Sequence, residues 1–262
     1  MLTLTRGVDL IYEPGLQRLA LGEVGRLSLV QVPVRLWITL EGSVPVDEGF
    51  LVHVAKINAA LRENLTEQQI KTGNGLEVLE WARGVLECKF PDFNVLRLKL
   101  DLSDRLSMTW LKERQEMIQI SRKYELAASH RLCNPDWDEK RNALVYGKCS
   151  NPQGHGHNYL LEVTLRGKTD RKTGELMSLE EVDKVVREQI IDRFDHKNLN
   201  EDSLEFKELI PTVENMVKVF WELMIGRFGK AELVRIAVWE TEKTYAEYFG
   251  PLAGPLRYSD SV

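Results

Sequence analysis

The sequence predicts an α+β protein built from two tandem ββααββ units, each an antiparallel sheet with its helices packed on one face. Two observations predict this fold. Stretches with β-branched and aromatic residues at period two flank stretches with apolar residues at helical spacing. This order of strands, helices and strands occurs once in each half of the 262-residue chain. We therefore expect an N-terminal domain over residues 1–115 and a second domain over residues 116–262.

The first half predicts a ββααββ unit without metal chemistry. We expect its strands near residues 2–12, 27–40, 94–101 and 105–110, and its helices near residues 46–63 and 74–89. Its one histidine, His53, is expected within the first helix, where a histidine is ordinarily not a ligand. Cys88 ends the second helical pattern, and we expect it to be small, apolar and buried. We interpret this half as a degenerate structural repeat, from element order alone.

The second half repeats the order. Strands are expected near residues 117–129 and 155–167, separated by a long loop, and closing strands near residues 233–239 and 244–249. Ser178, with Glu181 three residues on, predicts the capped start of a helix. A second helix is expected to begin near Thr212. Because four-stranded units leave open sheet edges, we expect a homo-oligomer, as a trimer, dimer or hexamer of two-repeat chains.

Composition excludes several classes of protein. A net charge of −5 and a pI near 5.7 argue against a general nucleic-acid binder. No apolar run approaches the roughly 20 residues of a membrane span, and the N-terminus lacks a signal-peptide pattern. The three cysteines cannot all pair within one chain, and we expect them to be reduced. The expected compartment is the cytoplasm.

Residues 147–159, Gly-Lys-Cys-Ser-Asn-Pro-Gln-Gly-His-Gly-His-Asn-Tyr, carry the strongest chemical signal. On a strand, His155 and His157 leave the same face, with Gly156 between them, and can close on one cation. His130, at the end of the preceding strand, is the expected third ligand. Three neutral imidazoles with an open fourth position are typical of catalytic zinc. The alternative is a hydrogen-bonded surface pair. Cys149 follows a lysine and lies near the proposed zinc, and both features favour its thiolate.

Two further clusters complete the candidate site. Asp195 precedes His196 in an irregular loop, where a carboxylate can orient an imidazole; the alternative is a polar loop that only ends a helix. Glu240, followed by Thr241, ends an apolar strand, where its carboxylate can accept two parallel N–H bonds from a guanine or pterin edge. Thr212 and Glu214 could equally be an N-cap and a carboxylate favoured by the helix dipole.

Five motifs in this order resemble the 6-pyruvoyltetrahydropterin synthase family over residues 118–250. They are Ala-Ala-Ser-His-Arg-Leu at 127–132, the run at 147–159, Asp-His-Lys-Asn-Leu-Asn at 195–200, Pro-Thr-Val-Glu-Asn at 211–215 and Glu-Thr at 240–241. The family also contains 6-carboxytetrahydropterin synthases and enzymes that yield a hydroxymethyl-dihydropterin. The cysteine-bearing run is most similar to the pyruvoyl-forming branch. The first half departs from the family's usual single-unit chain.

The resemblance implies the T-fold, in which ββααββ units associate into a barrel with the helices outside. It also implies a zinc ion on His130, His155 and His157. The implied substrate is 7,8-dihydroneopterin triphosphate, which loses triphosphate while its side chain is tautomerised and oxidised internally, so that no external redox cofactor is needed. Mg²⁺ is expected to accompany the triphosphate.

The resemblance further implies roles for the remaining site residues. Cys149 would take a proton from carbon, and Asp195 and His196 would relay protons on the other side. Glu240 would anchor the pterin ring, assisted by Thr212, Glu214 and the neighbouring Thr241.

Two readings of another class remain open. In the first, the protein is a non-catalytic pterin- or purine-binding module. In the second, its first half is a partner-docking surface that modifies the active repeat. The presence of Cys149 together with Asp195 and His196 favours an enzyme, because binding alone requires neither a nucleophile nor a proton relay.

Overall fold

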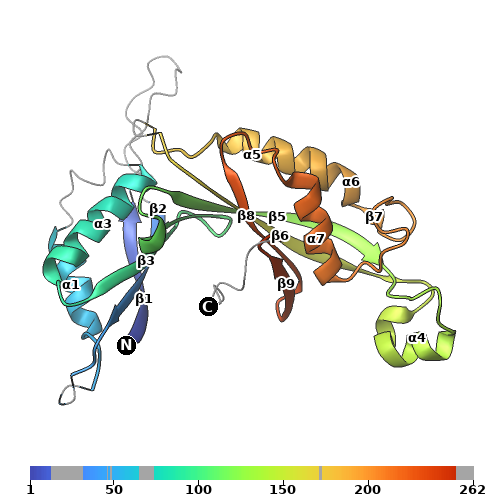
Figure 1. The fold of residues 1–262 in the computed structure, drawn as a ribbon, viewed down its shortest axis with the longest axis horizontal. Coiled ribbons are helices and arrows are strands. Elements are labelled where there is room, and N and C mark those ends of the chain that lie inside the picture. The colour runs from blue at the N-terminus through green and yellow to red at the C-terminus, as the bar shows by residue number, and fades with distance from the viewer. Residues whose placement is uncertain (13–31, 46, 48, 65–73, 171–172, 252–262) are drawn as a thin grey trace. The chain divides into compact units, whose positions relative to one another are not determined.

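The computed structural model describes residues 1–12, 32–45, 47, 49–64, 74–170 and 173–251. Two compact units divide the chain. Unit 1 is Met1–Ile120 with Gly167–Leu176, and unit 2 is Ser121–Arg166 with Met177–Val262. The α+β class predicted from the sequence is confirmed, since antiparallel strands and helices occur in both units (Figure 1).

Among its described residues, unit 1 contains four antiparallel strands and two α-helices. Its elements are β1 (Leu2–Tyr12), β2 (Val32–Gly42), α1 (Val54–Asn64), α3 (Gly75–Lys89), β3 (Asn94–Asp101) and β4 (Leu106–Leu111). The strands pair in sequence order, β1 with β2, β2 with β3 and β3 with β4. Helix α3 packs on β3 and β4 and also contacts α1. Within this unit the helices lie on one face of the strands (Figure 1).

Three expectations for unit 1 are corrected by the structure. Helix α1 begins at Val54 rather than near residue 46, because a turn around Gly49, at φ 72°, precedes it. His53 therefore lies before the helix, where its Nδ1 accepts a hydrogen bond from Ala55 N at 3.2 Å. Cys88 is exposed, because it lies two residues beyond Leu86 and so off the buried stripe of α3. Residues 27–31 of the second predicted strand lie outside the described residues.

Unit 2 has the same order of main elements. Strands β5 (Ile118–His130) and β6 (His155–Gly167) come first, and β8 (Glu232–Thr241) and β9 (Thr244–Tyr248) close the sheet, which runs β5-β6-β8-β9. A two-residue strand, β7 (Lys197–Asn198), lies parallel to β5. Between β6 and β8 come α5 (Leu179–Val186), a π-turn (Arg187–Ile191), α6 (Asp192–Phe194) and α7 (Val213–Met224).

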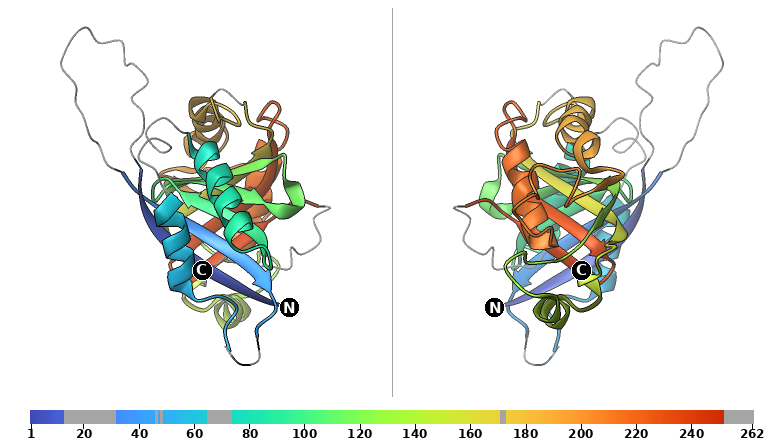
Figure 2. Two further views of the ribbon diagram at one scale, coloured as in Figure 1. Left: turned by 90° about the vertical axis from the view of Figure 1, so that its left-hand side faces the viewer. Right: turned by 90° about the vertical axis from the view of Figure 1, so that its right-hand side faces the viewer.

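Helices α5 and α7 cover one face of the unit 2 sheet (Figure 2). Helix α7 contacts β8 and β9, and its buried face includes Met216, Phe220 and Met224. Ser178 caps α5, as predicted, by accepting a hydrogen bond from Glu180 N. None of the helices in the described residues is long and apolar enough to cross a membrane.

The long loop expected between β5 and β6 contains a helix, α4 (Glu139–Tyr146), and a 3₁₀ turn (Gly147–Ser150). In helix α4, Asn142 is the buried residue and Leu144 and Val145 are exposed, so the helix lacks the buried apolar stripe that predicts a helix. Asp138 caps it by accepting a hydrogen bond from Arg141 N at 2.7 Å. In unit 2 this helix lies beyond the ends of β5 and β6, apart from α5 and α7 (Figure 1).

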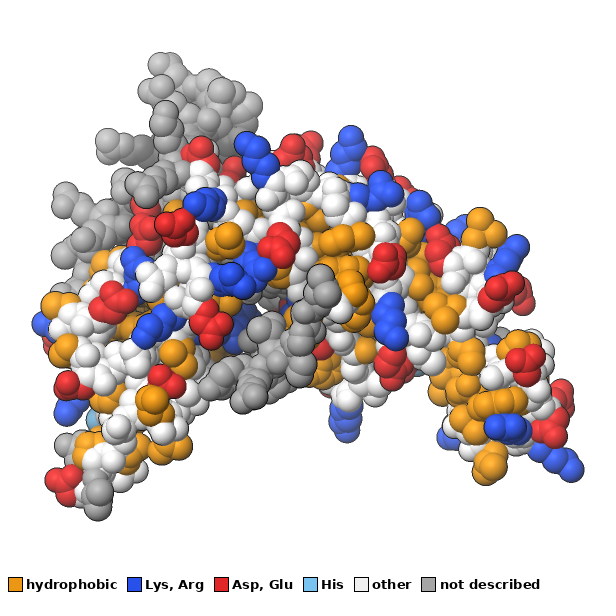
Figure 3. All heavy atoms as spheres, in the orientation of Figure 1, with side chains coloured by type: hydrophobic (Ala, Val, Ile, Leu, Met, Phe, Trp, Pro, Cys, Tyr) orange, Lys and Arg blue, Asp and Glu red, His pale blue; other side chains and the backbone are white. Residues whose placement is uncertain are grey.

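Basic and acidic side chains are interspersed on the face of the molecule shown in Figure 3. Ion pairs form at short distances among the described residues, such as Arg193 with Glu205 at 2.9 Å and Arg166 with Glu232 at 2.8 Å. Mixed charge of this kind does not create the single-sign surface field that attracts a polyanion.

Candidate metal centre

The candidate metal ligands extend the core-facing rows of two neighbouring strands. On β6, Tyr159 and Leu161 are fully buried on the inward face, and steps of two residues back along the strand reach His157 and His155. On β5, the inward row ends at His130, which is only 1% exposed. The same alternation that packs the core therefore aims three imidazoles into one end of the sheet.

The three imidazoles meet. The Nε2 atoms of His130 and His155 lie 3.1 Å apart, and the ring centroids of His130 and His157 lie 5.2 Å apart. One ligand atom from each ring, together with a carboxylate oxygen of Glu240, lies within 4.8 Å of the other three. The Nε2 atom of His157 is buried without a hydrogen-bond partner, which a metal ion would supply. This donor set of neutral nitrogens and one carboxylate fits a divalent metal.

His130 is held in the tautomer that a metal ligand needs. Its Nδ1 lies 2.8 Å from the carbonyl oxygen of Pro211, so this nitrogen donates and Nε2 keeps its lone pair. The hydroxyl of the buried Tyr159 lies 3.3 Å from the same Nδ1. Burial lowers the pKa of His130 to about 4, and burial also lowers the pKa of His157. Both rings are therefore neutral near pH 7, the protonation state that binds metal.

Glu240 reaches the cluster from the end of β8. Leu160 on β6 pairs with Trp239, so Glu240 follows at the level of Tyr159. Its Oε1 lies 3.3 Å from Nε2 of His157 and 3.4 Å from Nε2 of His130. Because both imidazoles have lowered pKa values, these contacts join a carboxylate to neutral rings and are not ion pairs. The sequence predicted Glu240 beside the site, but not this contact with the ligand nitrogens.

Cys149 lies in the 3₁₀ turn that follows α4 and is half-buried. Its carbonyl oxygen accepts a hydrogen bond from Leu132 N at 2.8 Å, which places the turn against the end of β5. Burial raises the pKa of Tyr159, and electrostatic interactions with Glu240 and then Cys149 raise it further. The cysteine is thus within electrostatic reach of the buried tyrosine that also contacts His130.

At Gly154, the segment that leads into β6 packs against the backbone of His130. It has φ 67°, and a Cβ at this position would lie 2.9 Å from the carbonyl oxygen of His130. Any side chain here would push β6 away from the ligand on β5. At Gly156, by contrast, a Cβ would make only ordinary contacts, the nearest at 3.5 Å from Ala128 O.

Asp195 and His196 form a pair on the opposite edge of β5 from β6. Nδ1 of His196 lies 2.9 Å from the Asp195 carboxylate, whose other oxygen accepts a hydrogen bond from Ala127 N at 2.8 Å. His196 has φ 57°, a left-handed conformation that is rare for a residue with a side chain, and its side chain is 81% exposed. Within the described part of the chain, neither residue forms a hydrogen bond or ion pair with Cys149.

The remaining candidate residues lie at the start of α7 and at the end of β8. Thr212 caps α7 by accepting a hydrogen bond from Asn215 N at 3.4 Å, and Glu214 is exposed in the first turn. Thr241 is exposed and accepts a hydrogen bond from Lys243 N at 3.2 Å. The N-cap that the sequence offered as the alternative for Thr212 is therefore present.

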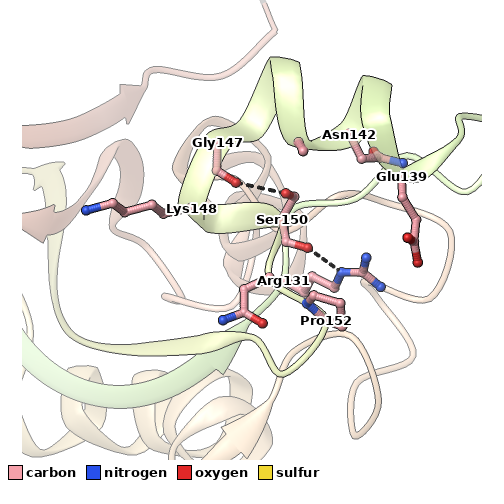
Figure 4. Close-up of a pocket in the computed structure, with 9 residues that line it drawn as sticks. Arg131, Glu139, Asn142, Gly147, Lys148, Ser150 and Pro152 are labelled. Carbon is pink, nitrogen blue, oxygen red and sulfur yellow. Dashed lines mark hydrogen bonds between the residues drawn. The ribbon is translucent and has the colours of Figure 1, made fainter.

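A surface pocket of about 410 Å³ lies beside the 3₁₀ turn. Arg131, Lys148 and Ser150 line it, but none of the three imidazoles does. Nε of Arg131 donates to the carbonyl oxygen of Ser150, and the Ser150 hydroxyl donates to that of Gly147 (Figure 4). The amine of Lys148 points away from Arg131 and Ser150 (Figure 4). The pocket is thus separate from the metal-ligand cluster.

Sequence reasoning missed the groups that support the ligands. Pro211 acts through its carbonyl oxygen, and every residue has one, so no residue type marks this role. Tyr159 continues the period of His155 and His157, and that spacing was the available signal. Asn215 belongs to the motif at 211–215, but its side-chain hydrogen bond to the carbonyl oxygen of Ile210 leaves no sequence signal.

The chain was compared with known proteins. A family model described as 6-pyruvoyl tetrahydropterin synthase matches residues 119–251. The 6-pyruvoyl tetrahydrobiopterin synthase of Poecilia reticulata is 40% identical over 131 residues, which are 50% of this chain and 89% of that protein. The human protein of the same name is 36% identical over 132 residues, 50% of this chain and 91% of its own.

More distant proteins also match. The 6-carboxy-5,6,7,8-tetrahydropterin synthase of Aquifex aeolicus is 26% identical, over 50% of this chain and 96% of its own length. The solved structure of the 6-pyruvoyl tetrahydropterin synthase of Caenorhabditis elegans is 30% identical, with a TM-score of 0.47, and the match covers 52% of this chain and 96% of that one.

Proposed function

This chain belongs to the 6-pyruvoyl tetrahydropterin synthase family, and from that premise we propose that it is a zinc-dependent lyase. The proposed reaction converts 7,8-dihydroneopterin triphosphate to 6-pyruvoyl-tetrahydropterin with loss of triphosphate. The observation that carries the proposal is the convergence of three imidazoles and Glu240 within 4.8 Å at the end of the unit 2 sheet. Simple packing gives no reason to gather three imidazoles and a carboxylate here, with Nδ1 of His155 and Nε2 of His157 buried without a hydrogen-bond partner.

The proposed metal is Zn²⁺, held by the Nε2 atoms of His130, His155 and His157. When bound, zinc would act as a Lewis acid on the side-chain oxygens of the substrate and acidify the neighbouring C–H and O–H bonds. The protein's part is to keep the three rings neutral and oriented. Burial of His130 and the Pro211 carbonyl on its Nδ1 support that role.

Glu240 is the proposed anchor of the pterin ring. Its carboxylate can accept two parallel N–H bonds from the amidine-like edge of the heterocycle. Because the carboxylate lies 3.3 Å from Nε2 of His157, a pterin ring bound to it would lie beside the metal ligands. We propose Thr212, Glu214 and Thr241 as assisting contacts.

Cys149 is the proposed base that takes a proton from the substrate side chain. Asp195 and His196 are proposed to hold and relay protons on the other side, and their 2.9 Å contact supports a coupled pair. The carboxylate would orient the imidazole and stabilise it when protonated. Since the substrate is oxidised and reduced internally, the proposal requires no external redox cofactor; Mg²⁺ would accompany the triphosphate.

Similarity to the Aquifex aeolicus protein makes formation of a 6-carboxytetrahydropterin the second candidate reaction. A hydroxymethyl-dihydropterin product is the third possible outcome of the same site. A non-catalytic pterin- or purine-binding module would keep Glu240 but would not need Cys149 or the Asp195–His196 pair.

Residues 1–115 are proposed to be a degenerate repeat of the catalytic domain at 116–262. The β-β-α-α-β-β order of unit 1 supports this, and His53 is exposed and outside any metal-ligand cluster among the described residues.

We also propose a homo-oligomer, trimer, dimer or hexamer, because β1 and β9 each pair with one strand only among those described. Mass measurement in solution would choose between them. The free thiols of Cys88, Cys133 and Cys149 fit the proposed cytoplasmic compartment.

One assay tests the proposal. Purified full-length protein loaded with zinc is incubated with 7,8-dihydroneopterin triphosphate and Mg²⁺, and the products are identified by mass spectrometry. We expect 6-pyruvoyl-tetrahydropterin and free triphosphate. A carboxy or hydroxymethyl product would assign the chain to another reaction of the family, and recovery of unchanged substrate would refute the enzyme proposal.

A further inference from the structure

We propose that Asn215 is a positioning residue for the metal ligand His130. It would act by holding the turn at Ile210–Thr212, whose Pro211 carbonyl accepts the Nδ1–H bond of His130. The inference rests on the proposed function in one respect, that the imidazole cluster binds a metal. It concerns how tightly the metal is bound, and not which pterin is made.

Asn215 reaches back past the start of its own helix. Its side-chain Nδ2 donates to the carbonyl oxygen of Ile210 at 2.8 Å, and Thr212 N donates to the same oxygen at 2.8 Å. These two bonds fix the residues on both sides of Pro211. Pro211 itself is buried, and its ring locks its own φ. The carbonyl that faces His130 therefore belongs to a turn that Asn215 ties to α7.

The hydrogen bond from His130 to Pro211 sets the orientation of the His130 ring. With Nδ1–H directed at the carbonyl oxygen 2.8 Å away, Nε2 of the 1% exposed ring is fixed toward His155 and His157. Because the ring is only 1% exposed, it has little surface on which water could replace this bond if the carbonyl moved. Changes to groups that orient metal ligands in this way typically weaken metal binding by about 10- to 100-fold.

Asn215 does not act only as part of the helix cap. The cap of α7 is the Thr212 hydroxyl, which accepts from the backbone N of Asn215 and is independent of the Asn215 side chain. The Asn215 amide instead bonds a residue five positions earlier. The two contacts can therefore be broken separately, which separates the stability of the helix from the orientation of His130.

The test compares the zinc affinity of full-length variants by competition with a chromophoric chelator. Asn215→Asp keeps the size of the side chain but replaces the donor with an acceptor, so it repels the Ile210 carbonyl. An acid in the first turn favours the helix, so α7 should not be weakened. Thr212→Ala breaks the cap and leaves the amide bond, and Lys218→Ala, an exposed residue one turn on, is the neutral control.

We expect Asn215→Asp to weaken zinc binding about 10- to 100-fold and to change the visible spectrum of the cobalt-substituted protein. Thr212→Ala should lower the unfolding temperature while zinc affinity and the cobalt spectrum stay as in the wild type. Equal zinc affinity in Asn215→Asp and wild type would overturn the inference, and so would an equal loss in Thr212→Ala. A wild-type protein that binds no zinc would refute the metal in the proposed function as well, whereas a failure confined to Asn215→Asp would leave that function standing.

Discussion

The Nε2 atoms of His130 and His155 lie 3.1 Å apart, although they come from neighbouring strands and 25 residues separate them. A tetrahedral ion with Zn–N bonds of about 2.0–2.1 Å sets two ligand nitrogens about 3.3 Å apart. The folded chain therefore places these two nitrogens close to the spacing that zinc requires. The inward rows of β5 and β6 and the bond from His130 to Pro211 together hold this geometry.

His155→Ala should remove most of the bound zinc. It deletes one of the three proposed nitrogen ligands. The loss of zinc affinity should therefore exceed the roughly 10- to 100-fold loss caused by changing a group that only orients a ligand. Elemental analysis of the purified protein measures the occupancy. His53→Ala, at the exposed histidine of unit 1, is the matched control and should keep full zinc. Full occupancy in His155→Ala would remove His155 from the ligand set.

Glu240→Gln should raise the KM for the pterin substrate about 10- to 100-fold, because an amide loses one of two matched acceptors and the charge behind both bonds. Steady-state kinetics separates KM from kcat. Since Glu240 also contacts His130 and His157, the zinc content must be measured in the same preparation. An unchanged KM at full zinc occupancy would contradict the anchoring role.

Cys149→Ala should lower kcat about 10²- to 10⁴-fold, the usual contribution of a positioned acid or base. Zinc should remain bound, since the sulfur is not among the converging ligand atoms. Cys88→Ser, at the exposed cysteine on α3 of unit 1, controls for the loss of a thiol and should keep wild-type turnover. Turnover by zinc-loaded Cys149→Ala at the wild-type rate would refute the assignment of the base.

The parts of this site that the sequence predicted are those carried by side-chain period and residue type. Alternation along residues 155–167 predicts the strand and the shared face of His155 and His157, and both are confirmed. Helix α4 has no buried apolar stripe to reveal it, because its apolar residues follow one another at the end of the helix. The Pro211 carbonyl leaves no mark either, because the groups that support His130 are backbone atoms and contacts over 81 residues of sequence.

Asp195 should make stability depend on pH. Burial raises the pKa of its carboxyl, but the hydrogen bonds from Ala127 N–H and from His196 outweigh burial and lower the pKa. The ionised form thus stabilises the folded state at pH values above the unfolded pKa of about 3.9, and this contribution is lost as the pH falls through the lower, folded pKa.

Urea unfolding of the wild type and Asp195→Asn between about pH 3 and pH 7 measures this contribution, around the unfolded pKa of aspartate. We expect the difference in free energy of unfolding to be largest at the upper end and to shrink toward the lower end. Asp192→Asn, at an exposed residue of α6, is the control and should track the wild type. A difference that stays constant across this range would show that ionised Asp195 does not stabilise the fold.

Arg235 should be the most costly charge to remove from unit 2. It lies on β8 between Glu162 of β6 and Glu247 of β9, bonded to both carboxylates, and its side chain is only 12% exposed. Lys123 on β5 lies 3.7 Å from Glu162, too far to replace a direct hydrogen bond. Arg235→Ala would leave two carboxylates facing each other across the sheet with little water, and we expect a loss of about 3–5 kcal/mol in the free energy of unfolding.

Urea denaturation measures the loss, and a second ion pair across the sheet provides the comparison. Arg166 of β6 bonds Glu232 of β8, but that carboxylate is 60% exposed, so water can replace the pair. Arg166→Ala should therefore cost no more than about 1 kcal/mol. Replacing Arg235 by Met together with Glu162→Gln and Glu247→Gln should recover much of the loss, because the penalty comes from uncompensated charge and not from missing attraction. If Arg235→Ala costs no more than Arg166→Ala, water must reach Glu162 and Glu247 in the folded protein.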